Sequence, residues 1–543
     1  MTAVDELVFD KRVDCVNGNI WGIICKNFHR TALGGQCESL IVIKSLAFAR
    51  VAPIGLDMPK TILIFSDGTG QIGGVKPDER LSNVYKMYRA MRPGPDSPID
   101  PKRQYAFYDA GLGAGETGGL TFRRLRNTLA AAVGTGIDEN VIDCYAAIIA
   151  HYEPGDKICL FGFSRGAYTV RSLANVMNLC GVPTHDAGGH PVPRYGPELR
   201  KIATDAVKFV YNHGAGHPRG KFEDEREEKA ARFRAKYGCE GTGVDGEPQG
   251  NVQPEFIGVF DTVAALGSRD ATAAAIVGVG ALTLLAALAW GLLGWFAGLL
   301  IFAPLLAALI WVVRLLSGQW KYFFPDADRR PALWNPLNWP SLWQHGHLAA
   351  WSSKNYDRYV DKEIPHLRHA LAIDEARAKF PRVLWGRPED VEWNNERGNV
   401  DWMRQVWFAG DHSDIGGSYA EEEARLSDIP LQWMMEELRA AVPEIAIREG
   451  LLTTWPDPLG LQHDQRQEVL NMQPGWLRWL TSSKLTWRTK IRPVNDVAML
   501  HPSVLDRFAA AVVPQMGEVK PYRPENLRDH EAFRHFFGDP NGA

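Results

Sequence analysis

One short segment of the sequence has the residue types and spacing of a nucleophilic serine. Ser164 is the centre of a Gly-x-Ser-x-Gly segment, with an apolar run at 158–161 before it and a helical pattern at 167–179 after it. A strand, a sharp turn and a helix in this order expose the serine hydroxyl, and the two glycines permit the turn. The N–H of Arg165 would then stabilise an oxyanion. The pattern predicts acyl transfer at Ser164 with no metal or organic cofactor.

Such a serine needs a histidine as its base, and the histidine needs a carboxylate that holds its tautomer. Around serine turns of this kind the chain order is Ser, then Asp or Glu, then His. The histidines that qualify downstream are His412, His463 and His501. The acids that qualify, in order of preference, are Asp414, Asp261 and Asp411. Asp414 ranks first because a glycine pair after it lets the loop turn inward, whereas Asp261 has an equal claim to be a capping carboxylate.

A second glycine-containing loop, Asp67-Gly68-Thr69-Gly70, follows the first apolar run. The loop after an early strand supplies the other oxyanion N–H in folds with this serine turn, so we expect Asp67, Gly68 and Thr69 to provide it. Glycine-rich loops also bind phosphate at helix starts. The loop has no Gly-Lys-Ser or Gly-Lys-Thr, and this argues against nucleotide hydrolysis.

The elements that position these residues form an alternating pattern. Short apolar runs that end in polar or glycine-rich residues alternate with helical patterns, at 61–65, 104–108, 157–161, 256–260 and 406–408. This predicts the α/β class, in an α/β-hydrolase-like arrangement with a mostly parallel central sheet flanked by helices. Ligands of parallel sheets bind beyond the carboxyl ends of the strands, where all five runs end. We expect 369–377 to be a charged amphipathic helix on the surface.

An uncharged apolar stretch, 271–313, interrupts this fold. A spanning helix needs about 20 apolar residues, so the stretch predicts two membrane helices, 271–290 and 292–313, which turn back at 291–294. Basic residues on both flanks favour cytoplasmic ends. Buried core helices are the alternative. The net charge of −4 excludes a basic nucleic-acid footprint, and seven scattered cysteines favour neither disulfides nor a zinc site.

These features predict five regions. They are an N-terminal extension at 1–57, the first part of the hydrolase core at 58–270, an apolar hairpin at 271–318, the second part of the core at 319–515 and a polar tail at 516–543. The extension lacks periodicity and leads into Met58 just before a strong strand. We therefore hypothesise that Met58 is the native start.

Several segments together resemble one protein family. The segments are 65–70, 162–167, 260–263, 369–375 and 407–417, in this order. They resemble the uncharacterised α/β-hydrolase domain family that includes the class-one type VI secretion lipase effectors. The resemblance implies phospholipase A-type esterase activity on membrane lipids. His501, in Met499-Leu500-His501-Pro502-Ser503-Val504, resembles the closing His-x-Ser-Val segment of the family, so it is the preferred base and His412 is its rival.

The expected protein is a membrane-anchored serine esterase that forms an acyl-enzyme on Ser164 and hydrolyses lipid esters. We expect it in a bacterial inner membrane, contacting the bilayer through 271–313, or in a target cell if it is a secreted effector. An effector would have an immunity protein or a secretion-apparatus protein as its partner. The alternatives are a membrane-anchored scaffold without activity and an esterase of soluble substrates.

Overall fold

The computed structural model describes residues 59–68, 71–111, 135–263, 318–325, 332–349, 358–465 and 489–537, apart from short gaps within them, and isolated positions between 277 and 310. The predicted extension at 1–57 and the predicted start at Met58 lie outside the described residues, as does Thr69.

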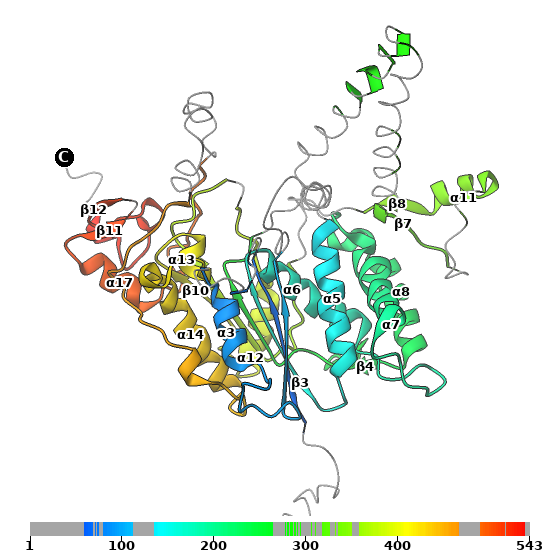
Figure 1. Cartoon of the computed structure of the whole chain (residues 1–543), viewed down its shortest axis with the longest axis horizontal. Helices are drawn as coiled ribbons and strands as arrows, with labels where there is room; N and C mark the ends of the chain where they lie inside the picture. Colours follow the sequence, from blue (N-terminus) through cyan, green and yellow to red (C-terminus); the bar gives the residue numbers. More distant parts are fainter. Residues whose placement is uncertain are drawn as a thin grey trace, which may run out of the picture. The chain divides into compact units, whose positions relative to one another are not determined.

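The framework is a six-stranded parallel sheet with the order β10-β9-β6-β3-β1-β2 (Figure 1). Five strands coincide with the apolar runs in the sequence, which confirms the α/β class. The six strands are β1 (Thr61–Ser66), β2 (Gln104–Asp109), β3 (Lys157–Phe163), β6 (Phe256–Phe260), β9 (His366–Ala372) and β10 (Met403–Phe408). Every neighbouring pair is parallel, so all six carboxyl ends lie at one edge.

The helix expected at 369–377 is not found, because residues 369–372 belong to the sixth strand of the sheet, β9. It is buried between β6 and β10, although it contains Arg368 and His369. The Arg368 side chain is paired with Glu437 of α14 (Arg425–Ala441), and Nε2 of His369 accepts a hydrogen bond from the Thr262 N–H at 3.3 Å. The charged residues predict a solvated face, and this prediction is wrong. The partners that accommodate Arg368 and His369 inside the fold are distant in the sequence and cannot be recognised from it.

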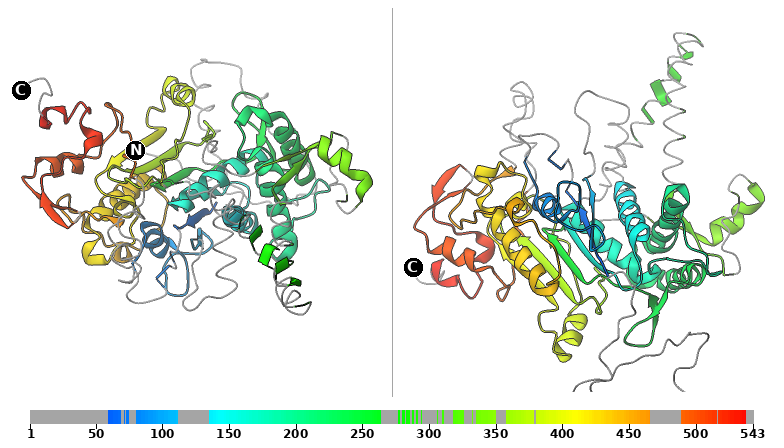
Figure 2. Two further views of the ribbon diagram at one scale, coloured as in Figure 1. Left: turned by 90° about the horizontal axis from the view of Figure 1, so that it is seen from above. Right: turned by 60° about the horizontal axis from the view of Figure 1, so that its bottom comes forward.

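Two hydrophobic cores cover the two faces of the sheet. In β1, Ile62 and Ile64 face α5 (Thr135–His151) and α6 (Arg165–Cys180). The alternate residues Leu63 and Phe65 face the core that contains α3 (Asn83–Met91) and α14 (Figures 1 and 2). Successive side chains of a strand point to opposite faces, so a strand covered on both sides is apolar throughout.

A third core lies outside β10, where Leu371 and Trp407 pack against α17 (Pro502–Ala509). The segment expected as a polar tail supplies three buried side chains to this core, from Tyr522, Leu527 and Phe533. Two short strands near it, β11 (Val513–Gln515) and β12 (Glu518–Lys520), pair with each other.

A helical layer packs outside α5 and α6 (Figure 1). It consists of α7 (Gly196–Thr204), the single-turn elements η1 (Asp205–Val210), η2 (Tyr211–Gly214) and η3 (Arg219–Lys221), and α8 (Glu223–Tyr237). A ribbon of β7 (Trp320–Tyr322) and β8 (Gly346–Leu348), with α11 (Trp339–Gln344) before β8, joins this layer. Remaining elements are β4 (Glu240–Thr242), β5 (Pro248–Gly250), η4 (Pro336–Asn338), α12 (Pro388–Glu396), α13 (His412–Gly416), η5 (Glu421–Glu423), η6 (Glu449–Leu451), η7 (Glu525–Leu527) and η8 (Arg534–Phe536).

Most of the apolar stretch at 271–313 lies outside the described residues, as do two of the four positions of its expected turn. The positions described between 277 and 291 are helical. Their large apolar side chains are exposed, including Val277, Leu284 and Trp290. Within the part of the chain that is described, no helix is long and apolar enough to cross a bilayer, so the expected pair of spanning helices is not found there.

Candidate active site

The turn between β3 and α6 holds Ser164 in a conformation that L-residues rarely adopt, with φ +58° and ψ −119°. Both glycines of the segment are required by close packing. A Cβ on Gly166 would lie 2.0 Å from the Ser66 carbonyl oxygen, and one on Gly162 would lie 2.5 Å from the Gly166 oxygen. Strain of this kind is retained where the surroundings fix it, commonly at functional sites. The local geometry is that of a nucleophile elbow.

Asp261, directly after β6, is completely buried and accepts four hydrogen bonds. One of its oxygens accepts from the Ala372 N–H at 3.1 Å and from Arg492 at 2.6 Å, and the other accepts from Arg492 at 3.1 Å and from Nδ1 of His412 at 2.5 Å. Burial alone would raise the pKa of Asp261, but the Arg492 charge and these hydrogen bonds outweigh it and hold the pKa well below its usual range. Asp261 is therefore a carboxylate at neutral pH.

His412 is the first residue of α13 and is buried beside the turn of Ser164. The carboxylate of Asp261 only accepts hydrogen bonds, so Nδ1 of His412 carries the proton and the lone pair lies on Nε2. Burial lowers the pKa of His412, while the hydrogen bond and charge of Asp261 raise it, and the net shift is downward. Nε2 has no hydrogen-bond partner among the described residues. The ring is thus neutral and able to accept a proton.

Ser164, Asp261 and His412 are connected through their neighbours. The Ser164 N–H donates to the Phe260 carbonyl at 3.1 Å, and this residue immediately precedes Asp261. On the other side, the Phe163 ring packs 4.7 Å from the His412 ring, centroid to centroid. A Cβ on Gly416 would lie 1.9 Å from the same Phe163 ring, so α13 approaches the elbow as closely as glycine allows. The structure therefore gathers a serine, a neutral histidine and an ionised aspartate at one sheet edge.

The predicted oxyanion loop lies against the elbow, but both of its described N–H groups are engaged. The Asp67 N–H donates to the Asp109 carbonyl within the sheet at 3.0 Å, so Asp67 is not available as the expected oxyanion donor. A Cβ on Gly68 would lie 2.9 Å from the Phe163 ring and 3.4 Å from Cβ of Ser164. The Gly68 N–H donates to the Asp67 carboxylate at 2.7 Å, and the same carboxylate accepts from the Tyr108 hydroxyl at 2.7 Å. Arg165 is the first residue of α6, and an N–H there has no intrahelical acceptor. The role expected of the Arg165 N–H stays a prediction, and the Gly68 N–H would have to release the Asp67 carboxylate before it could donate to an oxyanion.

Asp414 and Asp411 form a separate group with His463. Asp414 accepts from the Asp411 N–H at 3.0 Å, from the His463 N–H at 3.1 Å and from Nδ1 of His463 at 2.7 Å. Asp411 is the N-cap of α13 and accepts from two N–H groups of its first turn and from the Tyr419 hydroxyl. Burial and the neighbouring Asp414 charge raise the pKa of Asp411 well above its usual value. This group fixes the helix that carries His412.

His501 lies at the outer side of β10 and caps α17. Nδ1 of His501 is 2.8 Å from the Ser503 hydroxyl and accepts from the Ser503 N–H at 3.3 Å, and its ring stacks on Phe408. No hydrogen bond or ion pair joins it to Asp414 or Ser164 in the described part of the chain. Strands are about 4.8 Å apart, so a residue outside β10 is roughly 15–20 Å from β3, three strands away. The structure brings Ser164 to His412 and Asp261, and His463 to Asp414.

Arg492 is a site residue that the sequence analysis missed. Besides Asp261, it donates to the Phe380 carbonyl at 3.0 Å, and the Phe380 ring packs edge-on against His412 at 5.4 Å. Arg492 is 231 positions from Asp261 in the chain. No local sequence pattern identifies a single arginine at this distance. The signal that the sequence does contain is Asp261, since an aspartate directly after a buried strand requires a positive partner.

A basic cleft of about 290 Å³ lies away from these residues, between the helical layer and the β7–β8 ribbon. None of Ser164, Asp261 and His412 lines it. Its charged lining contains one acid, Asp205, and five bases, namely Lys201, Lys229, Arg232, Lys236 and Lys321. Aromatic side chains, among them Phe233 and Trp320, complete the wall. This composition suits an anionic group with an apolar part.

A six-stranded parallel sheet with helices on both faces places the protein in the α/β class. The comparison with protein families specifies the class further. The chain belongs to the family described as type VI secretion system phospholipase effector, Tle1-like, catalytic domain, which matches residues 60–281 and 332–437, more than half of the chain. The resemblance inferred from the sequence motifs is thereby confirmed.

Two further matches are to uncharacterised proteins. One is YEL023C of Saccharomyces cerevisiae, 30% identical over 130 residues, a match that spans 23% of this chain and 18% of that protein. The other is known from a crystal structure of a protein from Pseudomonas aeruginosa, with 14% identity and a TM-score of 0.29, over 76% of this chain and 50% of that one. The matches thus span half or less of these relatives.

Proposed function

We propose that the protein is a serine esterase that hydrolyses carboxylic esters of membrane phospholipids with Ser164, His412 and Asp261. The observation that carries this proposal is the hydrogen bond of 2.5 Å between Nδ1 of His412 and Asp261, beside the strained turn of Ser164. The order Ser, Asp, His along the chain agrees with the order usual for this elbow. His412 and Asp261 thus replace His501 and Asp414, which ranked first on the sequence.

In the proposed mechanism, Nε2 of His412 removes the Ser164 hydroxyl proton as Oγ attacks the ester carbonyl carbon. The Asp261 carboxylate stabilises the imidazolium that forms, and the Arg165 N–H at the start of α6 donates to the oxyanion. The tetrahedral intermediate collapses, and His412 returns the proton to the leaving alcohol oxygen. Water, deprotonated by the same nitrogen, then releases the fatty acid and restores Ser164.

Two features favour a lipid substrate and contact with a bilayer. Large apolar side chains of the described residues at 277–310 are exposed to solvent, including Leu284, Leu288 and Trp290. Exposed apolar clusters mark membrane or protein contact sites. The basic cleft lies next to β7, which follows this stretch in the sequence, and basic residues near apolar anchors attract anionic headgroups. We therefore propose that 271–313 contacts the bilayer while the active site acts on its esters.

The decisive experiment measures fatty acid release from mixed phospholipid vesicles by the parent and by three variants. Ser164→Ala and His412→Ala should each lose activity by about 10⁴-fold or more, because the serine and its base act as one unit. His501→Ala is the matched control, since it removes a partly buried histidine of the same sheet edge, and it should keep most of the activity. Loss with His501→Ala and retention with His412→Ala would contradict the assignment.

The same preparation distinguishes the other functions. A non-catalytic scaffold would neither release fatty acid nor react with a fluorophosphonate at Ser164. An esterase of soluble substrates would hydrolyse short-chain esters and leave vesicles intact. The family also includes effectors, so a further proposal is secretion into a target cell, with an immunity protein as partner. Protection of cells by the product of an adjacent gene would test this proposal.

A further inference from the structure

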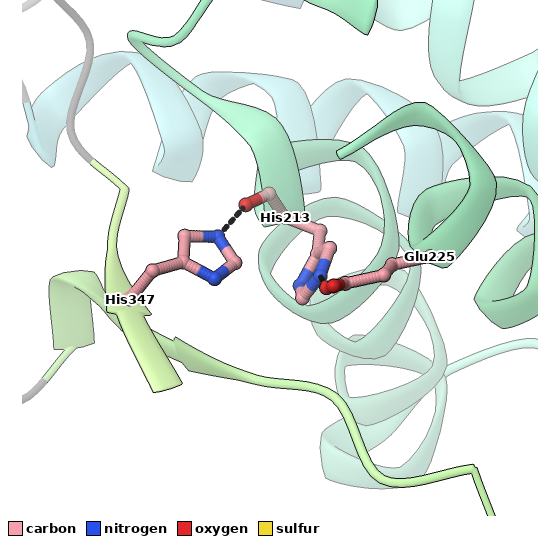
Figure 3. A group of neighbouring side chains, drawn as sticks. All are labelled: His213, Glu225 and His347. Carbon is pink, nitrogen blue, oxygen red and sulfur yellow. Dashed lines mark hydrogen bonds and ion pairs between the residues drawn. The ribbon is translucent and has the colours of Figure 1, made fainter. Parts of the chain in front are cut away.

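A cluster of metal-ligand side chains lies in the helical layer, outside the active site. His213 of η2, Glu225 of α8 and His347 of β8 each offer a ligand atom, and these atoms lie within 4.8 Å of one another (Figure 3). His213 is fully buried, and the other two are half-buried. Nε2 of His213 is 2.6 Å from a Glu225 oxygen. Three segments that are distant in the sequence thus converge on one point.

The hydrogen bond of His347 fixes its tautomer. Nε2 of His347 lies 2.7 Å from the backbone carbonyl oxygen of His213 (Figure 3). A carbonyl oxygen only accepts, so Nε2 carries the proton and the lone pair of the neutral ring is on Nδ1. Metal-bound histidines typically donate their second ring N–H to a carbonyl or carboxylate in this way. The Phe222 ring stacks on His347 at 3.7 Å and restricts its rotation.

His213 carries a buried nitrogen without a partner. Its Nε2 faces the Glu225 carboxylate, whereas its Nδ1 is inaccessible to solvent and has no hydrogen bond among the described residues. An unsatisfied buried nitrogen costs about 1–3 kcal/mol, so such atoms are rare in folded proteins. A metal ion coordinated through Nδ1 would give this nitrogen a partner.

We propose that His213, Glu225 and His347 bind one zinc ion, which fastens the β7–β8 ribbon to η2 and α8. Two imidazoles and one carboxylate are a common zinc ligand set, with a further position left for water. The ligand types decide which metal fits. Zinc binds imidazole nitrogen readily, whereas oxygen-preferring Mg²⁺ or Ca²⁺ would gain little from a single carboxylate.

The zinc ion would have a structural consequence for the neighbouring cleft. β7 follows the apolar stretch in the sequence, and its Lys321 lines the basic cleft together with Lys229 of α8. Fixing the ribbon at His347 therefore fixes one wall of that cleft. The ligands are far apart in the sequence, 134 positions between His213 and His347. For this reason the spacing of histidines and cysteines along the chain indicated no zinc site.

The test uses the untagged full-length protein, stripped with a chelator and then equilibrated with zinc before elemental analysis. The parent should retain about one zinc per chain, and His347→Ala and Glu225→Gln should each lose at least about tenfold in affinity. His190→Ala, which removes an exposed histidine outside the cluster, is the control and should retain zinc. Less than about 0.2 zinc per parent chain, or equal retention by the parent and His347→Ala, would overturn the proposal.

Cobalt substitution gives a readout that does not depend on activity. Co²⁺ bound by two imidazoles and a carboxylate in a four-coordinate site absorbs strongly in the visible range, and this absorption should appear in the parent and be lost in His347→Ala. Circular dichroism of each variant establishes that it is folded. Displacement of the cobalt by a hundredfold excess of Mg²⁺ would contradict a site built on nitrogen ligands.

Discussion

The protein contains two buried pairs of a histidine and an aspartate beside the same short helix, α13. In one pair Nδ1 of His412 binds Asp261 at 2.5 Å, and in the other Nδ1 of His463 binds Asp414 at 2.7 Å. The first pair lies against Phe163 of the serine turn, and the second stacks on Tyr419. The hydrogen bond alone therefore does not make a catalytic pair. Proximity to the strained serine and a buried counter-charge distinguish the first pair from the second.

The counter-charge explains how the two acids differ. Asp261 lies beside Arg492, which keeps the carboxylate ionised although it is fully buried. Asp414 instead lies beside a second carboxylate, Asp411, and these two side chains together cap the first turn of α13. One acid is suited to stabilising an imidazolium during a reaction. The other is suited to fixing the helix that presents His412.

The largest expected difference comes from removing each histidine. His412→Ala should lower kcat/KM for a phospholipid by about 10⁴-fold or more, because Ser164 loses its base. His463→Ala should lower it by less than about tenfold, because His463 only supports α13. The measurement is fatty acid release. Thermal unfolding of both variants is measured as well, so that a loss of folded protein is not counted as a loss of activity. Equal losses would remove the distinction between the pairs.

Exchanging each acid for its amide should give the next largest effect. Asp261→Asn keeps the shape but lets His412 adopt the other tautomer, which costs about 10⁴-fold in a comparable triad. Asp414→Asn keeps a hydrogen-bond acceptor for His463 and should leave kcat within about tenfold of the parent. Single-turnover acylation by a chromogenic ester measures both. If Asp414→Asn were the slower enzyme, Asp414 would be the catalytic acid.

The sequence predicts the nucleophile but does not decide between these pairs. The serine turn is a local pattern, and five of the six strands are apolar runs that can be recognised from their neighbours. The choice of acid depends on the strand order, which places β6, and with it Asp261, next to β3. Both pairs satisfy the chain order Ser, Asp, His. The pairing of Asp261 with Arg492, and of Arg368 with Glu437, is formed only in the folded chain.

Crowding at the contact between α13 and the elbow should have a smaller effect. Gly416→Ala would place a methyl group 1.9 Å from the Phe163 ring, where overpacking costs about 1–3 kcal/mol of unfolding free energy. Gly450→Ala is the matched control, because a Cβ there meets nothing within 4 Å, and it should change stability by less than about 0.5 kcal/mol. Denaturant unfolding measures both. An unchanged Gly416→Ala protein would show that α13 does not press on the elbow.

The smallest effect expected is a displaced pH profile. His412 must be neutral to accept the serine proton, and burial lowers its pKa below the usual 6.5. Activity should therefore persist as the pH falls to 6.5 and decline only when the pH passes through the lower pKa of the folded protein. The kcat/KM for an uncharged soluble ester reports this titration in the free enzyme. His463→Ala should give the same midpoint as the parent. A midpoint at or above pH 6.5, or a midpoint that shifts in His463→Ala, would show that a different histidine is the base.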